Sequence, residues 1–139
     1  RRALTLTDPE PMTRRRWIGW SLVGLAIVAL PDVARPHAFL VKAIPAHRAT
    51  LFHSPNRVQL WFNERLEPAY STVSVVDREN QRVDSQDARV GPDDSKLLSV
   101  TIPMLTPGTY TIRFRVLSVD GHVVESAYPF TIRSDRAKP

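Results

Sequence analysis

Cysteine is absent from this chain of 139 residues, and methionine is rare, with only Met12 and Met104. Without cysteine the chain forms no disulfide, no thiolate metal site and no cysteine nucleophile. Two methionines are too few for a methionine-rich site for a soft metal ion. Any metal site must therefore use backbone groups, carboxylates and histidines. The four histidines are His37, His47, His53 and His122.

A dense basic run is also absent from the part of the chain that reads as globular. Residues 1–36 carry six arginines against three acids, and residues 37–139 carry thirteen basic against eleven acidic residues. Most of the net charge of +5 therefore comes from the N-terminal quarter. Because nucleic-acid-binding domains gather their basic residues on one face, the sequence predicts no nucleic-acid partner.

Sequence motifs of common enzymes are missing as well. The chain has no G-x-S-x-G, no G-x-G-x-x-G and no P-loop. Glu64 and Glu67 form a carboxylate pair, but they stand at the end of a predicted strand beside Pro68, where solvated carboxylates are expected. The chain contains serine, histidine and aspartate, so residue types alone do not exclude a catalytic Ser-His-Asp arrangement. The sequence nevertheless predicts a protein that is not an enzyme.

The N-terminal segment, residues 1–36, has the pattern of an export signal. After Met12, three consecutive arginines precede the uncharged stretch Trp17–Leu30. This stretch of fourteen residues is short for a membrane-spanning helix, which needs about 20. We expect export to the periplasm or the cell exterior, with an uncleaved membrane anchor as the alternative. The cleavage site stays open, because "PDVARPHAFL" contains no A-x-A and places Pro36 directly before His37.

Residues 37–133 have the pattern of an all-β domain. Short segments rich in β-branched and aromatic residues are separated by turn signals such as Pro107-Gly108. In residues 109–116 the apolar side chains alternate with threonine and arginine, which indicates a half-buried antiparallel strand. About seven such strands predict an immunoglobulin-like antiparallel β-sandwich, with a small closed barrel as the second choice. The predicted strands are 57–62, 71–77, 96–102, 109–116 and 126–132.

Individual residues in this domain have structural interpretations. Tyr110, in "PGTYTI", has the setting of the tyrosine corner of immunoglobulin-like sandwiches. Trp61, Phe114 and Phe130 are interpreted as core residues. His47 and His53 are interpreted as solvated surface histidines. Residues 134–139, "SDRAKP", form a charged tail that we expect to fray.

The segment "LSVDGHVVE", residues 117–125, contains the candidate functional residues. Asp-Gly is a common hairpin turn, so a simple turn with an exposed histidine explains it. The same turn also places the Asp120 carboxylate two residues from the His122 imidazole. Carboxylate oxygen and imidazole nitrogen are donors that suit Cu(II), but two donors are too few for a tight site. From these residues alone both interpretations remain open.

Three segments together resemble the CopC family of exported copper-binding proteins. They are "HAFLVKAIPAHRATL" from His37, "VQLWFNERLEPAYSTVSV" from Val58 and "LTPGTYTIRFRVLSVDGHVVESAYPFTI" from Leu105. They occur in the family's order and at similar spacing, and they cover the chain from His37 to about Arg133. The last segment is the most specific, because P-G-T-Y, the D-G-H corner and the closing aromatic strand occur together.

The resemblance implies a small β-sandwich that binds one Cu(II) ion outside the cytoplasm in copper resistance or homeostasis. In the family, the first residue of the mature chain is a histidine that chelates the metal through its α-amine and imidazole, and this position corresponds to His37. The Asp and His of the D-G-H corner complete the site and correspond to Asp120 and His122. An acidic residue beside the site corresponds to Glu64. A CopD-like membrane protein, as a separate chain, is the partner that the resemblance implies.

Two departures from the family pattern affect this hypothesis. The chain lacks the methionine-rich loop with which some members bind Cu(I), so the expectation is a Cu(II)-only protein. Arg35 and Pro36 stand where family leaders commonly end in small residues, so the free amine of His37 depends on where the chain is cut. Two alternative functions remain: a copper monooxygenase that uses a histidine brace, and a metal-free sandwich that mediates contacts.

Overall fold

Eight strands follow one another in the part of the chain that the structure, a computed structural model, describes: residues 38–134. They are β1 (Leu40–Ile44), β2 (Thr50–Leu51), β3 (Arg57–Phe62), β4 (Thr72–Val76), β5 (Arg89–Val90), β6 (Leu97–Thr101), β7 (Gly108–Leu117) and β8 (Val123–Ile132). A single 3-10 turn, η1 (Pro68–Tyr70), lies between β3 and β4. The predicted export segment, His37 and residues 135–139 lie outside the described residues.

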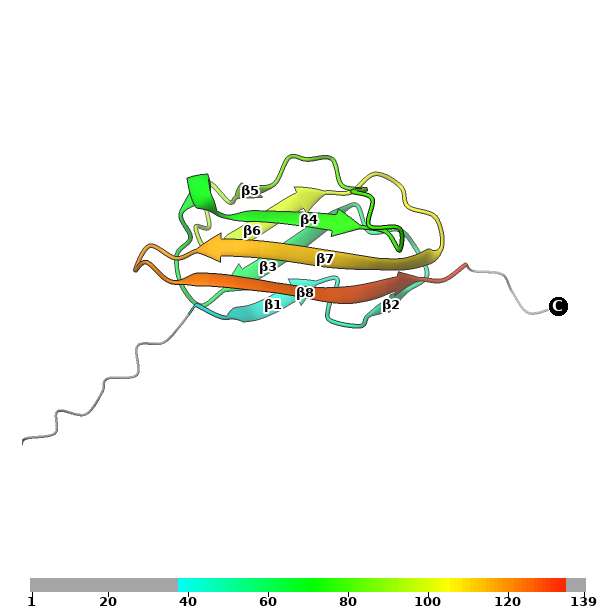
Figure 1. Ribbon diagram of the computed structural model, residues 1–139, viewed down its shortest axis with the longest axis horizontal. Coiled ribbons are helices and arrows are strands. Elements are labelled where there is room, and N and C mark those ends of the chain that lie inside the picture. Colours follow the sequence, from blue (N-terminus) through cyan, green and yellow to red (C-terminus); the bar gives the residue numbers. More distant parts are fainter. Residues whose placement is uncertain (1–37, 135–139) are drawn as a thin grey trace, which may run out of the picture. The chain divides into compact units, whose positions relative to one another are not determined.

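The strands form two sheets of four, which confirms the predicted β-sandwich. Sheet A has the order β1-β3-β6-β5, and sheet B has the order β2-β8-β7-β4. Figure 1 shows the long strands β7 and β8 side by side, with the turn between them at one end of the sandwich. The start of β1 lies at that same end. The topology therefore brings the N-terminal segment of the domain toward the turn that carries Asp120 and His122.

One strand pair departs from the antiparallel pattern that the sequence predicts. The two-residue strand β2 runs parallel to the end of β8, with Thr50 opposite Thr131. The N–H of Thr131 donates to Ala49 O at 2.8 Å, and the N–H of Arg133 donates to Leu51 O at 2.8 Å. So short a strand has no periodicity of its own and depends on β8 as its template.

The five predicted strands all occur, with ends shifted by up to three residues. The prediction did not name β1, which lies at the edge of sheet A. Its register on β3 shifts between Leu40 and Lys42, so its burial does not alternate from one residue to the next. Because period-2 alternation is the signal that identifies a strand, a bulged edge strand is difficult to recognise from sequence.

The core fills the space between the sheets. On β7, Tyr110, Ile112, Phe114 and Val116 are buried, as the alternation of that segment predicts. Aromatic rings connect the sheets: the ring of Phe62 on β3 meets that of Phe114 edge-to-face, with centroids 5.4 Å apart. The other buried apolar residues of the core are Val58, Leu60, Leu66, Val73, Val75, Leu98, Val100, Ile102, Tyr128, Phe130 and Ile132.

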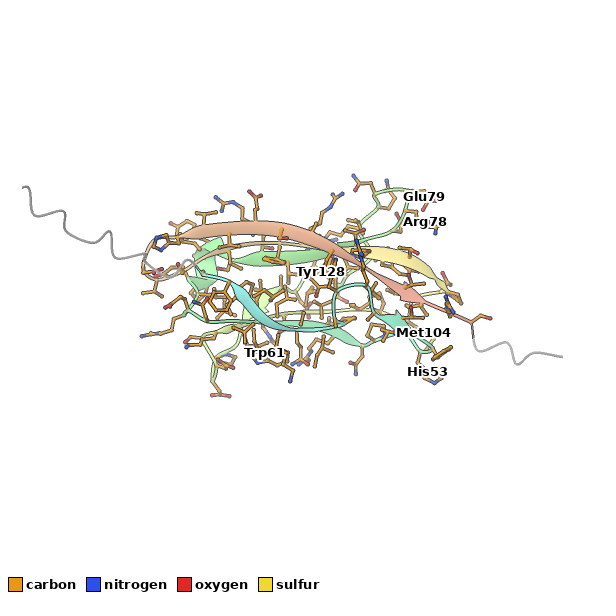
Figure 2. All side chains as sticks on the ribbon, turned by 90° about the horizontal axis from the view of Figure 1, so that it is seen from below. His53, Trp61, Arg78, Glu79, Met104 and Tyr128 are labelled. Carbon is orange, nitrogen blue, oxygen red and sulfur yellow. The ribbon has the colours of Figure 1, made fainter. Side chains whose placement is uncertain are left out.

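The prediction of a core position for Trp61 was wrong. Leu60 and Phe62 point into the core, so the alternation of β3 turns Trp61 to the outer side of sheet A, where it is half-buried. Figure 2 shows Trp61 on that side and Tyr128 between the sheets. The ammonium group of Lys42 lies 4.8 Å from the centroid of the indole ring, in cation–π range. Phe114 and Phe130 are core residues, as predicted.

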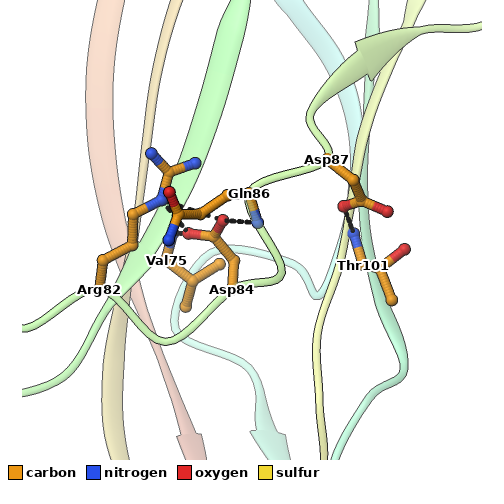
Figure 3. Close-up of polar contacts among 6 residues, drawn as sticks. All are labelled: Val75, Arg82, Asp84, Gln86, Asp87 and Thr101. Atoms are coloured by element: carbon orange, nitrogen blue, oxygen red, sulfur yellow. Dashed lines mark hydrogen bonds and ion pairs between the residues drawn. The ribbon is translucent and has the colours of Figure 1, made fainter.

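Two polar arrangements tie loops to the sandwich. The hydroxyl of Tyr110 donates to Thr106 O at 2.7 Å, which is the geometry of a tyrosine corner. In the segment between β4 and β5, the buried Asp84 carboxylate accepts hydrogen bonds from Val75 N at 2.9 Å and Gln86 N at 2.8 Å (Figure 3). The Arg82 guanidinium reaches the same carboxylate at 2.8 Å. Asp84 thus supplies the polar partner that this loop backbone needs.

No helix within the described residues has the length and apolar character that crossing a membrane requires.

Candidate metal centre

The turn between β7 and β8 is built by hydrogen bonds that close on Ser118. The N–H of Ser118 donates to His122 O at 2.9 Å, and the N–H of Gly121 donates to Ser118 O at 2.9 Å. Gly121 has φ of 93°, a left-handed conformation that residues with a Cβ rarely adopt. The glycine therefore permits the sharp bend that returns the chain into β8.

The Ser118 side chain organises the interior of this turn. It is fully buried, and its hydroxyl donates to Oδ1 of Asp120. The Ser118 hydroxyl oxygen also accepts a hydrogen bond from His122 N at 3.1 Å. One small hydroxyl thus fixes the Asp120 side chain and the His122 backbone. The sequence did not predict this role, although serine hydroxyls commonly form hydrogen bonds with backbone groups a few residues away, as Ser118 does with His122.

Asp120 and His122 meet across the turn. Oδ2 of Asp120 lies 3.0 Å from Nδ1 of His122, and the two side chains are 44% and 25% exposed. The hydrogen bond from Ser118 is the largest influence on the pKa of Asp120 and lowers it. Desolvation opposes this effect, and His122 adds to it, so the net pKa lies below the usual value. The carboxylate is therefore kept ionised and directed toward the imidazole.

Two other segments of the chain are hydrogen-bonded at this end of the sandwich. The N–H of Phe39 donates to Oδ1 of Asn63 at 2.6 Å, and Asn63 N donates back to Phe39 O at 3.1 Å. The N–H of Val119 donates to Arg65 O at 2.9 Å. The Asn63–Arg65 segment therefore lies between the start of β1 and the β7–β8 turn. Ala38, the residue after His37, is buried at 3% exposure.

The structure brings together some of the predicted site residues. Asp120 and His122 form a pair, while the half-buried Glu64 is placed with its Oε1 3.5 Å from Nδ2 of Asn63. Within residues 38–134, no three His, Asp or Glu side chains lie close enough to hold a metal ion together. His37 lies outside the described residues. The described part of the site is thus a carboxylate–imidazole pair whose side chains are partly exposed.

The donor set of this pair suits a first-row transition metal. Two ligand atoms that each lie about 2.0 Å from a metal ion at right angles are about 2.8 Å apart. The separation of 3.0 Å between Oδ2 of Asp120 and Nδ1 of His122 is close to this value. One oxygen and one nitrogen donor, on a turn fixed by Ser118, can therefore form two neighbouring positions of a tetragonal site.

The two other histidines among residues 38–134, His47 and His53, are exposed, as the sequence predicts. The ring of His47 meets Tyr128 edge-on, with centroids 5.8 Å apart. His53 and Met104 line one hollow together with Ile132, the last residue of β8. Figure 2 shows both at the end of the sandwich where β8 finishes, opposite the β7–β8 turn. Neither histidine joins the Asp120–His122 pair.

The fold and this turn define a class: immunoglobulin-like β-sandwiches with an acid–histidine corner between their two longest strands. A family model described as the CopC domain matches residues 40–133. The chain belongs to the CopC family, which confirms the resemblance found in the sequence.

Similar proteins are named for copper. The copper transport protein CutJ of Bacillus subtilis is 30% identical over 122 residues, which are 87% of this chain but only 22% of CutJ. The crystal structure of CopC from Methylosinus trichosporium OB3b is 38% identical, with a TM-score of 0.67, over 74% of this chain and all of that one. PcoC, a methionine-rich copper resistance protein from Escherichia coli, is 26% identical, with a TM-score of 0.58, over 70% of this chain and all of that one.

Proposed function

We propose that this chain binds one Cu(II) ion outside the cytoplasm and sequesters or delivers it in copper resistance or homeostasis. The observation that carries the proposal is the contact of 3.0 Å between Asp120 and His122, at the end of the sandwich where β1 begins. Family membership and relatives named for copper transport and resistance support the choice of metal.

His37, Asp120 and His122 are the proposed ligands. Asp120 supplies an anionic oxygen, and His122 supplies an imidazole nitrogen. If the mature chain begins at His37, its α-amine, with an ordinary pKa near 8, loses its proton readily to a metal ion and closes a chelate ring with its imidazole. Together these donors form the nitrogen- and oxygen-rich set that Cu(II) prefers. Glu64, beside this end of the sandwich, is proposed to orient or buffer the site without being a principal ligand.

Copper is cargo in this proposal, and no catalytic step is assigned to it. The side chains of Asp120 and His122 are 44% and 25% exposed on a turn at the end of the sandwich, so a partner can approach this corner. A CopD-like membrane protein is the proposed recipient or donor, by analogy with the family. Because this chain matches only 22% of CutJ, the activity of that whole protein is not transferred to it.

The test is a Cu(II) titration, followed by electron paramagnetic resonance, on two forms of the chain: one beginning at His37 and one beginning at Arg35. We expect one tight equivalent and a tetragonal, nitrogen-rich spectrum for the first form. The second form has no free amine on His37, so we expect weaker binding with fewer nitrogen donors. Equal affinity and identical spectra would show that the His37 amine is not a ligand.

A pair of variants tests the corner itself. His122→Ala removes a proposed ligand, whereas His53→Ala removes an exposed histidine at the other end of the sandwich. We expect the first change to weaken Cu(II) binding by about tenfold or more and the second to leave it unchanged. If the two variants bind copper alike, the assignment of the site to this corner is wrong.

A further inference from the structure

The outer face of sheet B carries a hollow lined by arginine and hydroxyl side chains. On β7, Arg113 and Arg115 point outward, because the residues between and beside them point into the core. On the neighbouring strand β4, Ser74 lies opposite Arg113, and Thr72 lies opposite Arg115. On the other side, β8 places Ala127 opposite Arg113. The hollow across these three strands has a volume of about 550 Å³.

The two arginines are available for a ligand. Both are exposed, and neither forms an ion pair or a side-chain hydrogen bond with any residue between 38 and 134. Glu125, opposite Arg115, is the one carboxylate among the residues that line the hollow. The lining has two guanidinium groups and three hydroxyls against one carboxylate, which leaves an excess of positive charge and of hydrogen-bond donors.

A third arginine, Arg78, lies near the other end of β7, where Asp77 and Glu79 line a hollow with it and offset its charge. Nη2 of Arg78 lies 3.4 Å from Oγ1 of Thr109, near the other end of the same outward row. Between Thr109 and Arg113, the outward residue of β7 is Thr111, which has a hydroxyl group and no negative charge. The outward row of the strand is therefore basic and polar from Thr109 to Arg115.

The spacing of the arginines indicates the shape of the ligand. Residues two apart on a strand are separated by about 6.7 Å. An extended acidic segment presents alternate side chains on one face at the same interval, so two of its carboxylates can face Arg113 and Arg115 together. A guanidinium group can hold a carboxylate through two parallel hydrogen bonds. The position of the hollow on the flat of a sheet, open to solvent, favours a chain segment over an enclosed small molecule.

We propose that this face binds an extended acidic segment of a partner protein. Arg115 precedes Ser118 by three residues, which is about 10 Å along the strand. A partner held here would therefore lie beside the turn that carries Asp120 and His122. The proposal goes beyond the proposed copper binding and does not depend on it, because the contacts use no metal ligand.

The experiment uses the metal-free full chain and an acetylated, amidated peptide that alternates serine with four glutamates. Nuclear magnetic resonance titration is expected to show saturable binding, with amide shifts concentrated at residues 72–74 and 113–115. Binding should weaken steeply as salt is raised, because exposed ion pairs are screened. A peptide with glutamine in place of glutamate should not bind. Shifts spread evenly over the domain would overturn the proposal without any variant.

Two double variants of equal charge change complete the test. Arg113→Gln with Arg115→Gln should weaken peptide binding at least tenfold. Arg57→Gln with Arg89→Gln, which removes two exposed strand arginines from sheet A, should leave it unchanged. Equal weakening by both would show that only net charge matters. Binding to phosphatidylglycerol vesicles in preference to the peptide would replace the proposed partner by a membrane. A separate Cu(II) titration distinguishes failure of this proposal from failure of the copper site.

Discussion

Oδ2 of Asp120 lies 3.0 Å from Nδ1 of His122, although only Gly121 separates the two residues in the chain. Side chains at positions i and i+2 meet here because the chain turns sharply at Gly121, whose φ of 93° is left-handed. The buried Ser118 hydroxyl fixes both residues, because it donates to the Asp120 carboxylate and accepts from the His122 backbone N–H. The pair is thus a property of the turn as a whole.

Replacing Asp120 by Asn tests its role as an anionic donor. The side chain keeps its size but loses its charge, so we expect Cu(II) affinity to fall by about ten- to a hundredfold. Competition titration against a chelator of known affinity measures this change. Glu79→Gln is the matched control, because Glu79 is exposed and lies at the opposite end of the sandwich (Figure 2). Unchanged affinity in Asp120→Asn would remove Asp120 from the ligand set.

Replacing Ser118 by Ala tests how the turn organises the pair. The change removes a buried hydroxyl that donates to Asp120 and accepts from His122 N, and we expect a loss of about 1–3 kcal/mol of stability. It should also raise the pKa of Asp120 toward its usual value, because the Ser118 hydrogen bond is the largest cause of the lowering. A carbon-detected titration of the Asp120 carboxyl group measures this shift. Ser134→Ala, beyond the end of β8, serves as the comparison, and a pKa that moves equally in both variants would contradict the assigned role.

Replacing Asp84 by Asn tests the buried carboxylate between β4 and β5. Burial alone raises the pKa of Asp84, but hydrogen bonds from Arg82, Val75 N and Gln86 N together lower it below its ordinary value. At pH 7 we expect the variant to lose about 2–3 kcal/mol, because the buried N–H groups lose a charged acceptor. Urea unfolding measures this difference.

The pH dependence of that difference has a definite sign. A carboxyl group with a lowered folded-state pKa stabilises the fold above its unfolded-state pKa of about 3.9, and this stabilisation is lost as pH falls through the folded-state value. The gap between the wild-type chain and Asp84→Asn should therefore be full at pH 7 and shrink below about pH 4. Asp87 and Asp120, whose pKa values are also lowered, titrate in both proteins and cancel. A gap that is constant from pH 7 to pH 2.5 would exclude ionised Asp84 as its cause.

Replacing Tyr110 by Phe tests the tyrosine corner. The ring remains stacked near Phe130, with centroids 5.6 Å apart, but the hydrogen bond to Thr106 O is lost. We expect destabilisation of about 1 kcal/mol, measured by thermal unfolding. Tyr70→Phe, at a position that is 63% exposed, should change stability little. Equal effects at the two positions would argue against the corner.

The strands that are rich in β-branched and aromatic residues and are bounded by turn signals were the ones that could be predicted. β3 and β7 also show the apolar alternation of a buried face, whereas β4, β6 and β8 were recognised by composition. The strands β2 and β5 have two residues each and exist because a longer neighbour offers unpaired backbone groups. Trp61 shows that single residues are also difficult to place, because an aromatic residue type does not by itself predict which face of a strand the side chain occupies.

The candidate site, too, was predictable only where its contacts are local in the chain. The sequence predicted that Asp120 and His122 would share a turn, because Asp-Gly favours one and the spacing is local. It could not predict that Ser118 would be buried within this turn. Nor could it predict that Phe39 would be hydrogen-bonded to Asn63, 24 residues away in the chain. Contacts of that kind depend on which strands pair, and a period-2 pattern gives the faces of strands but not their neighbours.

The sequence by itself therefore determined the class of fold, the family and the two residues of the D-G-H corner, all of which follow from short-range patterns. The tertiary structure alone decided what surrounds that corner, and it placed Arg113 and Arg115 over a hollow with Thr72 and Ser74. The physical reason is that pairing between β4, β7 and β8 sets which side chains become neighbours, and its register depends on the whole packed sandwich.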